Sequence, residues 1–333
     1  EDGSNGQVMV YQPKFYYRVV PLKLEKNSVS GLGYHIRKAN YYVTDKPQTG
    51  FKIHPVFIDG NGNEIDYVLL SAFEGSMYDV STSTYVNDGT NTDTAIGEGD
   101  LLCSVSGVKP ISGLKKALTK TNAETMAVNR GLGWHLETIK ATMANTLLMM
   151  IEFGTLNSQT ALGNGITSIT DNTSFNCSSL TGSTAALGNA SGAASETINE
   201  IGGTETTYNV NGKVSVSYRG VENPWGNIWK HIQGINIWGN GTMAGGQPYI
   251  ADGLSDFGES KHTGNYKAVG FTLPNASGYI NAFGYGKTEY DWLLMPSEIG
   301  GTSALPVGDY TYITPNLNGY RIALLGGNWT YGG

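Results

Sequence analysis

The residue types that most often carry enzyme chemistry are few in this chain and widely separated. Its five histidines, at positions 35, 54, 135, 231 and 262, include no pair at the spacing of a metal site. His135 stands two residues before Glu137, and we assign that pair to the start of a helix. The sequence contains no Gly-x-Ser-x-Gly elbow and no phosphate-binding loop. Carboxylates could still pair in space, as glycosidases require, which a sequence alone does not reveal. We expect no enzyme, no catalytic residue, no metal and no cofactor.

Two further patterns could bind or react. Residues 59–64 read Asp-Gly-Asn-Gly-Asn-Glu and imitate the start of a calcium loop. That loop requires Gly at its sixth position and Glu at its twelfth, where this chain has Glu64 and Leu70. The Asp-Gly and Asn-Gly pairs instead predict a hairpin turn. Cys103 and Cys177 could form a disulfide, but two lone buried thiols are the favoured interpretation.

The composition favours a loop-rich β protein that faces outward. Only 15% of the 333 residues are charged, whereas Gly accounts for 46 and Tyr for 20. The formal net charge of −7 argues against nucleic acid or an anionic membrane as the main partner. The longest apolar run, Leu147–Ile151, is far too short to cross a bilayer, so we expect no membrane insertion. The first residues lack the pattern of a signal peptide, and without an initial Met residue 1 is expected to be internal to a longer or processed protein.

The elements that would position any site are mainly strands. One clear helix is predicted, because Leu136, Ile139, Met143, Leu147 and Met150 recur at three- and four-residue steps and form a core stripe. It has no obvious cap near its start unless it begins one turn later, where Thr138 would serve, and Gly154 would end it. Two short helices are predicted at Leu114–Lys120 and Asn122–Arg130, with Thr121 as a cap between them. Strands are expected at Val8–Tyr11, Phe15–Leu24, Tyr34–Val43, Phe51–Ile58, Ile65–Phe73, Tyr310–Thr314 and Tyr320–Leu325, with short strands or turns at Ala268–Leu273, Gly278–Tyr285 and Trp292–Pro296.

We expect one domain over residues 1–333. Residues 162–212 are dominated by Gly, Ser, Thr, Asn and Ala, which predicts a long flexible insertion. No repeat of fixed period and no linker divides the chain.

We interpret Ser217–Gly234 as the stretch around which the chain is organised. Trp225 and Trp229 stand four residues apart, with Gly226 and Asn227 between them. Each indole buries much apolar area and needs a partner for its N–H. The favoured interpretation is a buried structural knot, and a platform for stacking sugars is the alternative.

The same residues carry a family resemblance. Pro-Trp-Gly-Asn-Ile-Trp-Lys (224–230) resembles the Gly-Asn-Val-Trp-Glu-Trp signature of C-type-lectin-fold proteins of the formylglycine-generating-enzyme-like branch. The longer string Tyr218–Ile237 is similar to prophage and phage structural proteins of that branch, which include receptor-binding and retroelement-diversified proteins. Asp2–Tyr17, Phe51–Gly75, Gly131–Gly163 and Leu324–Trp329 resemble further family segments in the correct order.

The chain departs from this family in three ways. Family members continue with strands that close the sheet after the Gly-Gly-x-Trp segment, so the C-terminal closing strands are expected to be missing here, in a cut or variant chain. The calcium and sugar motif Glu-Pro-Asn is absent, since Glu222-Asn223-Pro224 transposes its last two residues. Cys103 and Cys177 lie far upstream of the reactive pair of the formylglycine-forming relatives, and the iron-binding His cluster of the sulfoxide synthases is missing.

The resemblance implies an α+β, C-type lectin-like fold, mostly antiparallel β with one long helix, one or two short helices and long loop insertions. It implies a virion protein of a bacteriophage, located in the extracellular particle as a tail-tip, fibre or head-fibre component. Its partners would be a host bacterial surface glycan or protein and other virion proteins, in a homotrimer. The alternatives are a ligand-free capsid decoration or trimerisation module and, less favoured, a formylglycine-type oxidase.

Candidate residues follow from this interpretation. Loops rich in Tyr, Asn, Gly and Ser combine rigid amphipathic contacts with adaptable hydrogen bonding. The expected ligand-binding residues lie on such loops and are Trp238, Asn240, Tyr285, Asn328, Trp329 and Tyr331. For Trp238, Trp329 and Tyr331, contacts in the core or between subunits are an equally good explanation. The expected structural motif consists of Arg219, Glu222, Trp225, Gly226, Asn227 and Trp229.

Overall fold

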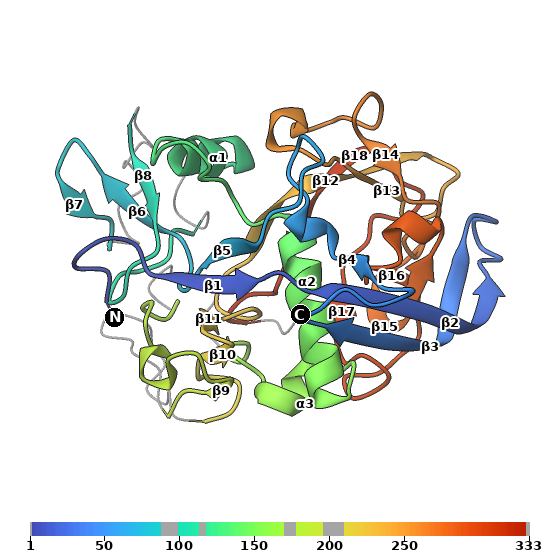
Figure 1. Cartoon of the computed structure of the whole chain (residues 1–333), viewed down its shortest axis with the longest axis horizontal. Helices are drawn as coiled ribbons and strands as arrows, with labels where there is room; N and C mark the ends of the chain where they lie inside the picture. Colours follow the sequence, from blue (N-terminus) through green and yellow to red (C-terminus); the bar gives the residue numbers. More distant parts are fainter. Residues whose placement is uncertain (1, 88–98, 113–117, 170–177, 196–209, 331–333) are drawn as a thin grey trace.

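A computed structural model describes residues 2–87, 99–112, 118–169, 178–195 and 210–330. Helix α2 (Ile139–Phe153) runs through the centre of the molecule, and strands from both ends of the chain surround it (Figure 1). Two shorter α-helices, α1 (Lys120–Val128) and α3 (Ser158–Leu162), flank it in sequence.

The strands of the described residues form five antiparallel sheets. The largest has the order β16-β15-β3-β2-β4, with β17 paired to β15 (Pro296–Ile299, Gly278–Tyr285, Tyr34–Thr44, Tyr16–Lys26, Lys52–Ile53 and Tyr310–Thr311). The second has the order β14-β13-β12-β18 (Lys267–Ala268, Gln247–Ile250, Lys230–Asn240 and Asn318–Leu325). The small sheets are β1-β5 (Met9–Pro13, Tyr67–Ser71), β11-β10-β9 (Val221–Glu222, Val216–Tyr218, Gly192–Ala193) and β7-β6-β8 (Thr84–Tyr85, Ser76–Asp79, Leu101–Cys103).

This architecture corrects the expected fold class. Strands make up 33% of the described residues and helices 14%, so the protein is β-rich and not the α+β, C-type lectin-like fold that the resemblance implied. The motif around Trp225 pointed to that fold, but a short motif fixes only its own turns. The pairing of the strands around it is decided by residues far away in sequence, and here they divide into several separate sheets.

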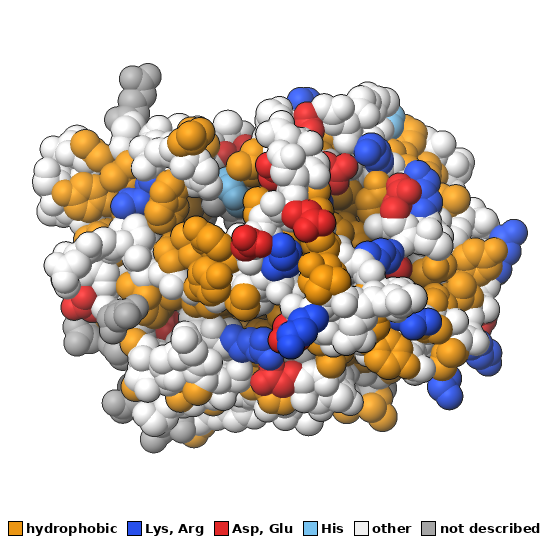
Figure 2. Space-filling model, in the orientation of Figure 1, with side chains coloured by type: hydrophobic (Ala, Val, Ile, Leu, Met, Phe, Trp, Pro, Cys, Tyr) orange, Lys and Arg blue, Asp and Glu red, His pale blue; other side chains and the backbone are white. Residues whose placement is uncertain are grey.

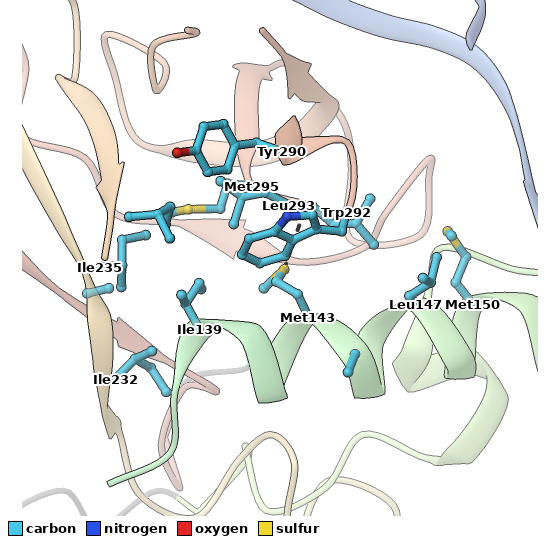
Figure 3. Close-up of a cluster of buried hydrophobic side chains, with 14 of the residues drawn as sticks. Ile139, Met143, Leu147, Met150, Ile232, Ile235, Tyr290, Trp292, Leu293 and Met295 are labelled. Carbon is cyan, nitrogen blue, oxygen red and sulfur yellow. Dashed lines mark hydrogen bonds between the residues drawn. The ribbon is translucent and has the colours of Figure 1, made fainter. Parts of the chain in front are cut away.

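The predicted core helix is confirmed from Ile139 onward, whereas Leu136, the first residue of the expected stripe, lies before α2 in a separate cluster with Ala123 and Ala127. Ile139, Met143, Leu147 and Met150 are buried along one side of α2 and point at a cluster that includes Trp292 (Figure 3). Burying each of these side chains contributes about 1.5–3 kcal/mol to the hydrophobic term. Because this stripe faces the core, contacts outside the core are left mainly to the other sides of α2.

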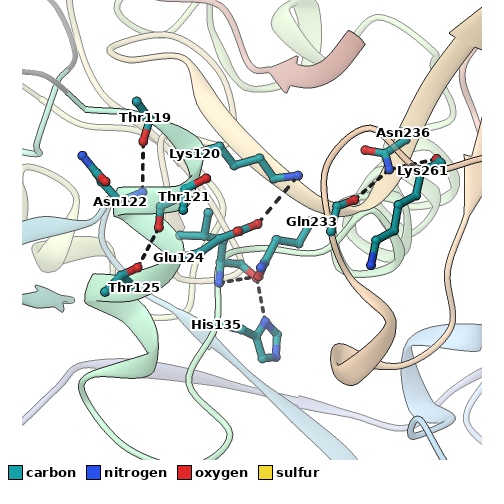
Figure 4. A network of polar contacts seen from close by, with 12 residues as sticks. Thr119, Lys120, Thr121, Asn122, Glu124, Thr125, His135, Gln233, Asn236 and Lys261 are labelled. Atoms are coloured by element: carbon teal, nitrogen blue, oxygen red, sulfur yellow. Dashed lines mark hydrogen bonds and ion pairs between the residues drawn. The ribbon is translucent and has the colours of Figure 1, made fainter. Parts of the chain in front are cut away.

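The helix ends follow local hydrogen-bond chemistry. Thr138 caps α2 by accepting a hydrogen bond from Ala141 N at 3.2 Å, and Gly154 ends the helix at φ 63°. The expected Thr121 cap is wrong: Thr119 caps α1 by accepting from Asn122 N at 3.1 Å (Figure 4). The Leu114–Lys120 helix falls largely on residues 113–117, outside the described residues.

The segment before α2 is anchored to β12. The Gln233 side chain accepts a hydrogen bond from Leu136 N at 2.9 Å (Figure 4), and the Gln233 backbone N–H donates to Glu137 O at 2.9 Å. These two bonds hold Glu137 at the entrance of α2, next to the second sheet.

The predicted turn at 59–64 forms, but the strands beside it do not pair with each other. Asp59 Oδ1 accepts from Asn61 N at 2.9 Å and from Asn63 N at 2.8 Å, which closes the turn without a metal. Only Ile58 and Glu64 form a bridge across it. β5 pairs with β1 and β4 with β2, and a 3₁₀ turn, η1 (Pro55–Phe57), occupies the rest of the expected first strand.

Among the later strands, the expected Gly278–Tyr285 is confirmed as β15 and β18 begins two residues earlier than expected, whereas β14 and β17 are shorter and β16 begins only at Pro296. Three more 3₁₀ turns lie within the described residues: η3 (Ala185–Leu187), η4 (Leu254–Asp256) and η5 (Thr288–Tyr290). Within the described residues, no helix has the length and apolar character needed to cross a bilayer.

Candidate functional site

The segment Asn223–Asn227, here called the Trp225 knot, is a buried structural element. Three of its residues, Asn223, Gly226 and Asn227, have positive φ angles of 47°, 78° and 62°. Asn and Gly tolerate this conformation better than other residues do. The Trp225 side chain is 7% exposed, and its indole N–H donates to Gly163 O at 3.2 Å. The favoured interpretation of Trp225 is therefore confirmed.

The buried carboxylate of Glu74 holds this knot together. It accepts hydrogen bonds from Asn223 Nδ2 at 3.1 Å and Asn227 Nδ2 at 2.5 Å, and it pairs with Lys230 Nζ at 3.0 Å. Glu74 is 6% exposed, so its charge is compensated by these three donors rather than by water.

Glu222 is satisfied in the same way. Its carboxylate accepts from Gly182 N at 2.8 Å, Thr184 N at 2.7 Å and Thr184 Oγ1 at 2.8 Å. Burial raises the pKa of Glu222 to about 7, although these hydrogen bonds oppose the rise. Arg219, in contrast, lies at the surface and pairs with Glu152 at 2.8 Å.

The knot also orders parts of the stretch expected to be a flexible insertion. Asn227 donates through its backbone N–H to Ile166 O at 2.8 Å and accepts from Ser179 N at 2.8 Å. Ile166 and Ser179 are completely buried. Within 162–212, these described parts belong to the body of the protein, because buried polar groups of the knot need their backbone as partner.

Trp229 differs from Trp225, because it is only half-buried and faces other aromatic rings. Its ring lies 6.3 Å from that of Tyr312, which lies 4.9 Å from Tyr310, which lies 5.2 Å from Tyr279. We call these four side chains the aromatic row. Tyr312 is 57% exposed and Tyr279 36%, so the row leads from the interior to the surface.

The inner part of this row lines a cavity of about 480 Å³, here called the α2 groove. The flank of α2 next to its core stripe forms one wall through Thr142, Asn145, Thr146 and Met149, and Met143 of the stripe also lines the groove. The edge strand β18 contributes Ile322 and Leu324, and the other walls include Trp229, Tyr310, Tyr312, Phe283 and Ile280. The groove thus has apolar and aromatic walls with a few polar groups, as small-molecule sites usually have.

Two carboxylates face the α2 groove near opposite ends of α2. Glu137 precedes the helix and accepts from Thr142 Oγ1 at 2.9 Å, whereas Asp309 accepts from Gln159 Nε2, on α3, at 3.1 Å. Figure 1 shows α3 beside the far end of α2, and the fifteen residues of α2 span about 22 Å. This separation is far too large for the two carboxylates to act on one bond.

Both carboxylates have raised pKa values. The loss of water around Asp309 raises its pKa to about 7, against the lowering effect of Gln159. Glu137 is accessible from the groove, yet the surrounding protein displaces enough water to raise its pKa, with Thr142 and Lys230 opposing.

The structure does not bring the expected ligand-binding residues together. Trp238 and Asn240 lie at one end of β12, where Trp238 stacks on His262 at 4.1 Å between ring centroids. Asn240 is exposed, and its Oδ1 accepts from Thr242 N at 3.1 Å in a local turn.

The remaining expected residues lie elsewhere. Tyr285 is half-buried on β15, paired with Tyr34 of β3. Asn328 and Trp329 follow β18 at the end opposite to Asn240, and Trp329 is 5% exposed, in a core cluster with Ile166. Tyr331 lies outside the described residues.

Tyr310, Tyr312 and Asp309 were not among the binding residues expected from the sequence. A signal was available, because the Tyr-Thr-Tyr pattern at 310–312 places both rings on one face of an extended segment. Its proximity to Trp229, some 80 positions earlier, depends on tertiary packing.

Among the described residues, metal or thiol chemistry depends on two features, namely clusters of metal-ligating side chains and the environment of Cys103. No group of three His, Cys, Asp or Glu residues there could hold a metal ion. Cys103 is buried and without a disulfide, and burial raises its pKa, which suppresses the thiolate. Cys177 lies outside the described residues. Comparison with protein-family models and with curated proteins gives no match for this chain.

Proposed function

We propose that this protein recognises a glycan through the α2 groove and the aromatic row, without chemical conversion, and that the glycan belongs to a host bacterial surface. The observation that carries the proposal is the row of four rings that runs from the open α2 groove along the surface. Aromatic faces are rigid and amphipathic, which suits contact with the apolar faces of sugar rings while hydroxyl groups stay hydrogen-bonded.

The polar groups of the groove support the same ligand class. Thr142, Asn145 and Thr146 present hydroxyl and amide groups from the wall formed by α2. A chain of sugar units could lie along the helix with its rings against Trp229, Tyr310 and Tyr312. The setting in a bacteriophage virion comes from the sequence resemblance, independently of the groove.

An array of purified bacterial surface polysaccharides tests the glycan proposal. The wild-type protein should bind at least one polysaccharide, and Tyr312→Ala should weaken that binding about tenfold, the loss of one good aromatic contact. Tyr312 is 57% exposed, so the variant keeps its fold. Tyr34→Ala removes a ring that is 42% exposed elsewhere and should bind like the wild type. No binding to any polysaccharide would contradict the proposal.

The virion setting has a separate test. Mass spectrometry of phage particles purified from the organism that encodes the chain should detect its peptides as a particle component. Their presence only in the cell fraction would contradict a virion role.

A homo-oligomer, proposed as a trimer, is the second candidate, and one surface feature favours it. Tyr11, Tyr67 and Leu69 are 58%, 47% and 53% exposed, and they share one face of the β1-β5 sheet. The two tyrosine rings stack at 4.8 Å, and Figure 2 shows hydrophobic side chains gathered over these strands. Such a patch is typical of a contact surface. The mass of the protein in solution tests it: a monomer at micromolar concentration would contradict the proposal.

A further inference from the structure

The ionisable groups that face the α2 groove differ in whether other protein groups already compensate their charge. Four ionisable groups other than tyrosine line it: Glu137, Glu222, Lys230 and Asp309. Lys230 is held by Glu74 at 3.0 Å, so its charge is already compensated inside the knot. Glu222 is enclosed by its three donors at Gly182 and Thr184.

Glu137 and Asp309 are the groups left to meet a ligand. Among the described residues, neither has an ion-pair partner within 4 Å. Their hydrogen-bond donors there are neutral, a threonine hydroxyl for Glu137 and a glutamine amide for Asp309. Each of these bonds occupies one carboxylate oxygen, which leaves a second oxygen for another donor.

Position strengthens the effect of these two charges. Asp309 is followed directly by Tyr310 and Glu137 shares a cavity with Trp229, so a sugar on the aromatic row would lie close to a carboxylate. Asp309 is only partly exposed and the loss of water around it raises its pKa, so its interaction with a ligand charge is screened less than at the open surface, whereas Glu137 is exposed to solvent. The net charge of −7 adds to the same field.

From this arrangement we infer that the α2 groove selects glycans that are neutral or carry free amino groups, and excludes glycans with carboxylate or phosphate groups. The inference rests on the proposed glycan-binding function and names the ligand class. An ammonium group would donate a charge-assisted hydrogen bond to Asp309 or Glu137, and it would also be attracted to the face of a neighbouring ring. An acidic sugar would meet like charge with no available cation in the described wall of the groove.

The test uses the full chain and three matched oligosaccharides: N-acetylated chitotetraose, which is neutral, its 2-aminoethyl glycoside, whose primary amine is cationic, and tetragalacturonate, which is anionic. The polysaccharide array, sorted into the same three charge classes, is measured in parallel so that sugar identity does not limit the result. At pH 8, above the pKa of about 7 of Asp309, neutral and amino glycans should bind at least tenfold more tightly than acidic ones.

Two isosteric variants connect that selectivity to the groove. Asp309→Asn and Glu137→Gln should each weaken binding of amino glycans at least threefold and strengthen binding of acidic ones, with neutral glycans unchanged. Asp66→Asn, at a carboxylate 85% exposed just before β5, should leave all three classes unchanged.

The outcomes separate the inference from the proposed function. Binding of acidic glycans as tight as that of neutral ones, or selectivity that both variants leave intact, would overturn the inference while glycan recognition stands. The absence of binding in all three classes would overturn both.

Discussion

Trp225 and Trp229 stand four residues apart in one segment, yet they belong to different kinds of environment. Trp225 is buried with its N–H bonded, and every polar neighbour in the Glu74 network has a partner. Trp229 is half-buried, its ring begins a row that reaches solvent, and two carboxylates of the same cavity have no ion-pair partner among the described residues.

This contrast shows how a motif can hold a fold and carry a site at once. In the knot, each buried polar group is matched, which leaves nothing for a ligand to satisfy. In the α2 groove, Asp309 and Glu137 keep acceptor capacity and the rings keep exposed faces. Carboxylates with acceptor capacity left over and rings with exposed faces are what a ligand can contact, and so we assign a structural role to Trp225 and propose a recognition role for Trp229.

The largest expected effect is on the knot. Glu74→Ala leaves Asn223, Asn227 and Lys230 without their shared acceptor and should lower the free energy of unfolding by about 3–5 kcal/mol. Urea denaturation measures this, with Asp66→Ala as control, because the exposed Lys14–Asp66 pair is worth about 0–1 kcal/mol. A loss below about 1 kcal/mol for Glu74→Ala would remove the central role of that carboxylate.

A second comparison uses two glycines with positive φ. A Cβ at Gly226, in the knot, would lie 2.7 Å from Ile166 O, whereas a Cβ at Gly241 would meet nothing within 4 Å. Gly226→Ala should therefore cost about 2–5 kcal/mol, from strain and overpacking, and Gly241→Ala about 1–2 kcal/mol, from strain alone. Thermal unfolding of both variants checks this order, and equal losses would show that the knot is not tightly packed.

The free energy of unfolding should depend on pH through Asp309, a carboxylate of the α2 groove. The pKa of Asp309 is raised from 3.8 to about 7 in the folded protein, so the folded state binds this proton more tightly than the unfolded state. Its contribution to stability is fully present below pH 4 and is lost as pH rises toward 7. Asp309→Asn should flatten the fall in unfolding free energy between pH 4 and 7, measured by urea titration at each pH. An unchanged slope would place Asp309 in water.

Local features were predictable from the sequence, and long-range ones were not. The core stripe and C-terminal end of α2, the Asp59 turn and the burial of Trp225 follow from spacing and residue chemistry, and the structure agrees. The fold class was wrong, because the division into five sheets depends on pairings such as β1 with β5, separated by more than fifty residues.

The candidate site shows the same limit. Tyr310 and Tyr312 reach Trp229 only through the packing of β17 beside β15. The composition of 162–212 predicted a flexible insertion. Sequence patterns do not reveal that backbone N–H groups of this stretch donate hydrogen bonds to Asn227 and Glu222. The residues expected to bind ligand were chosen as loop aromatics, and several have their faces or polar atoms occupied inside the protein.

Intrinsic fluorescence during glycan titration tests the division of roles between Trp225 and Trp229 most directly. With a polysaccharide that binds the wild type, Trp225→Phe should keep the ligand-induced change in emission, and Trp229→Phe should lose most of it. A change that survives in Trp229→Phe and disappears in Trp225→Phe would contradict our assignment of recognition to the α2 groove.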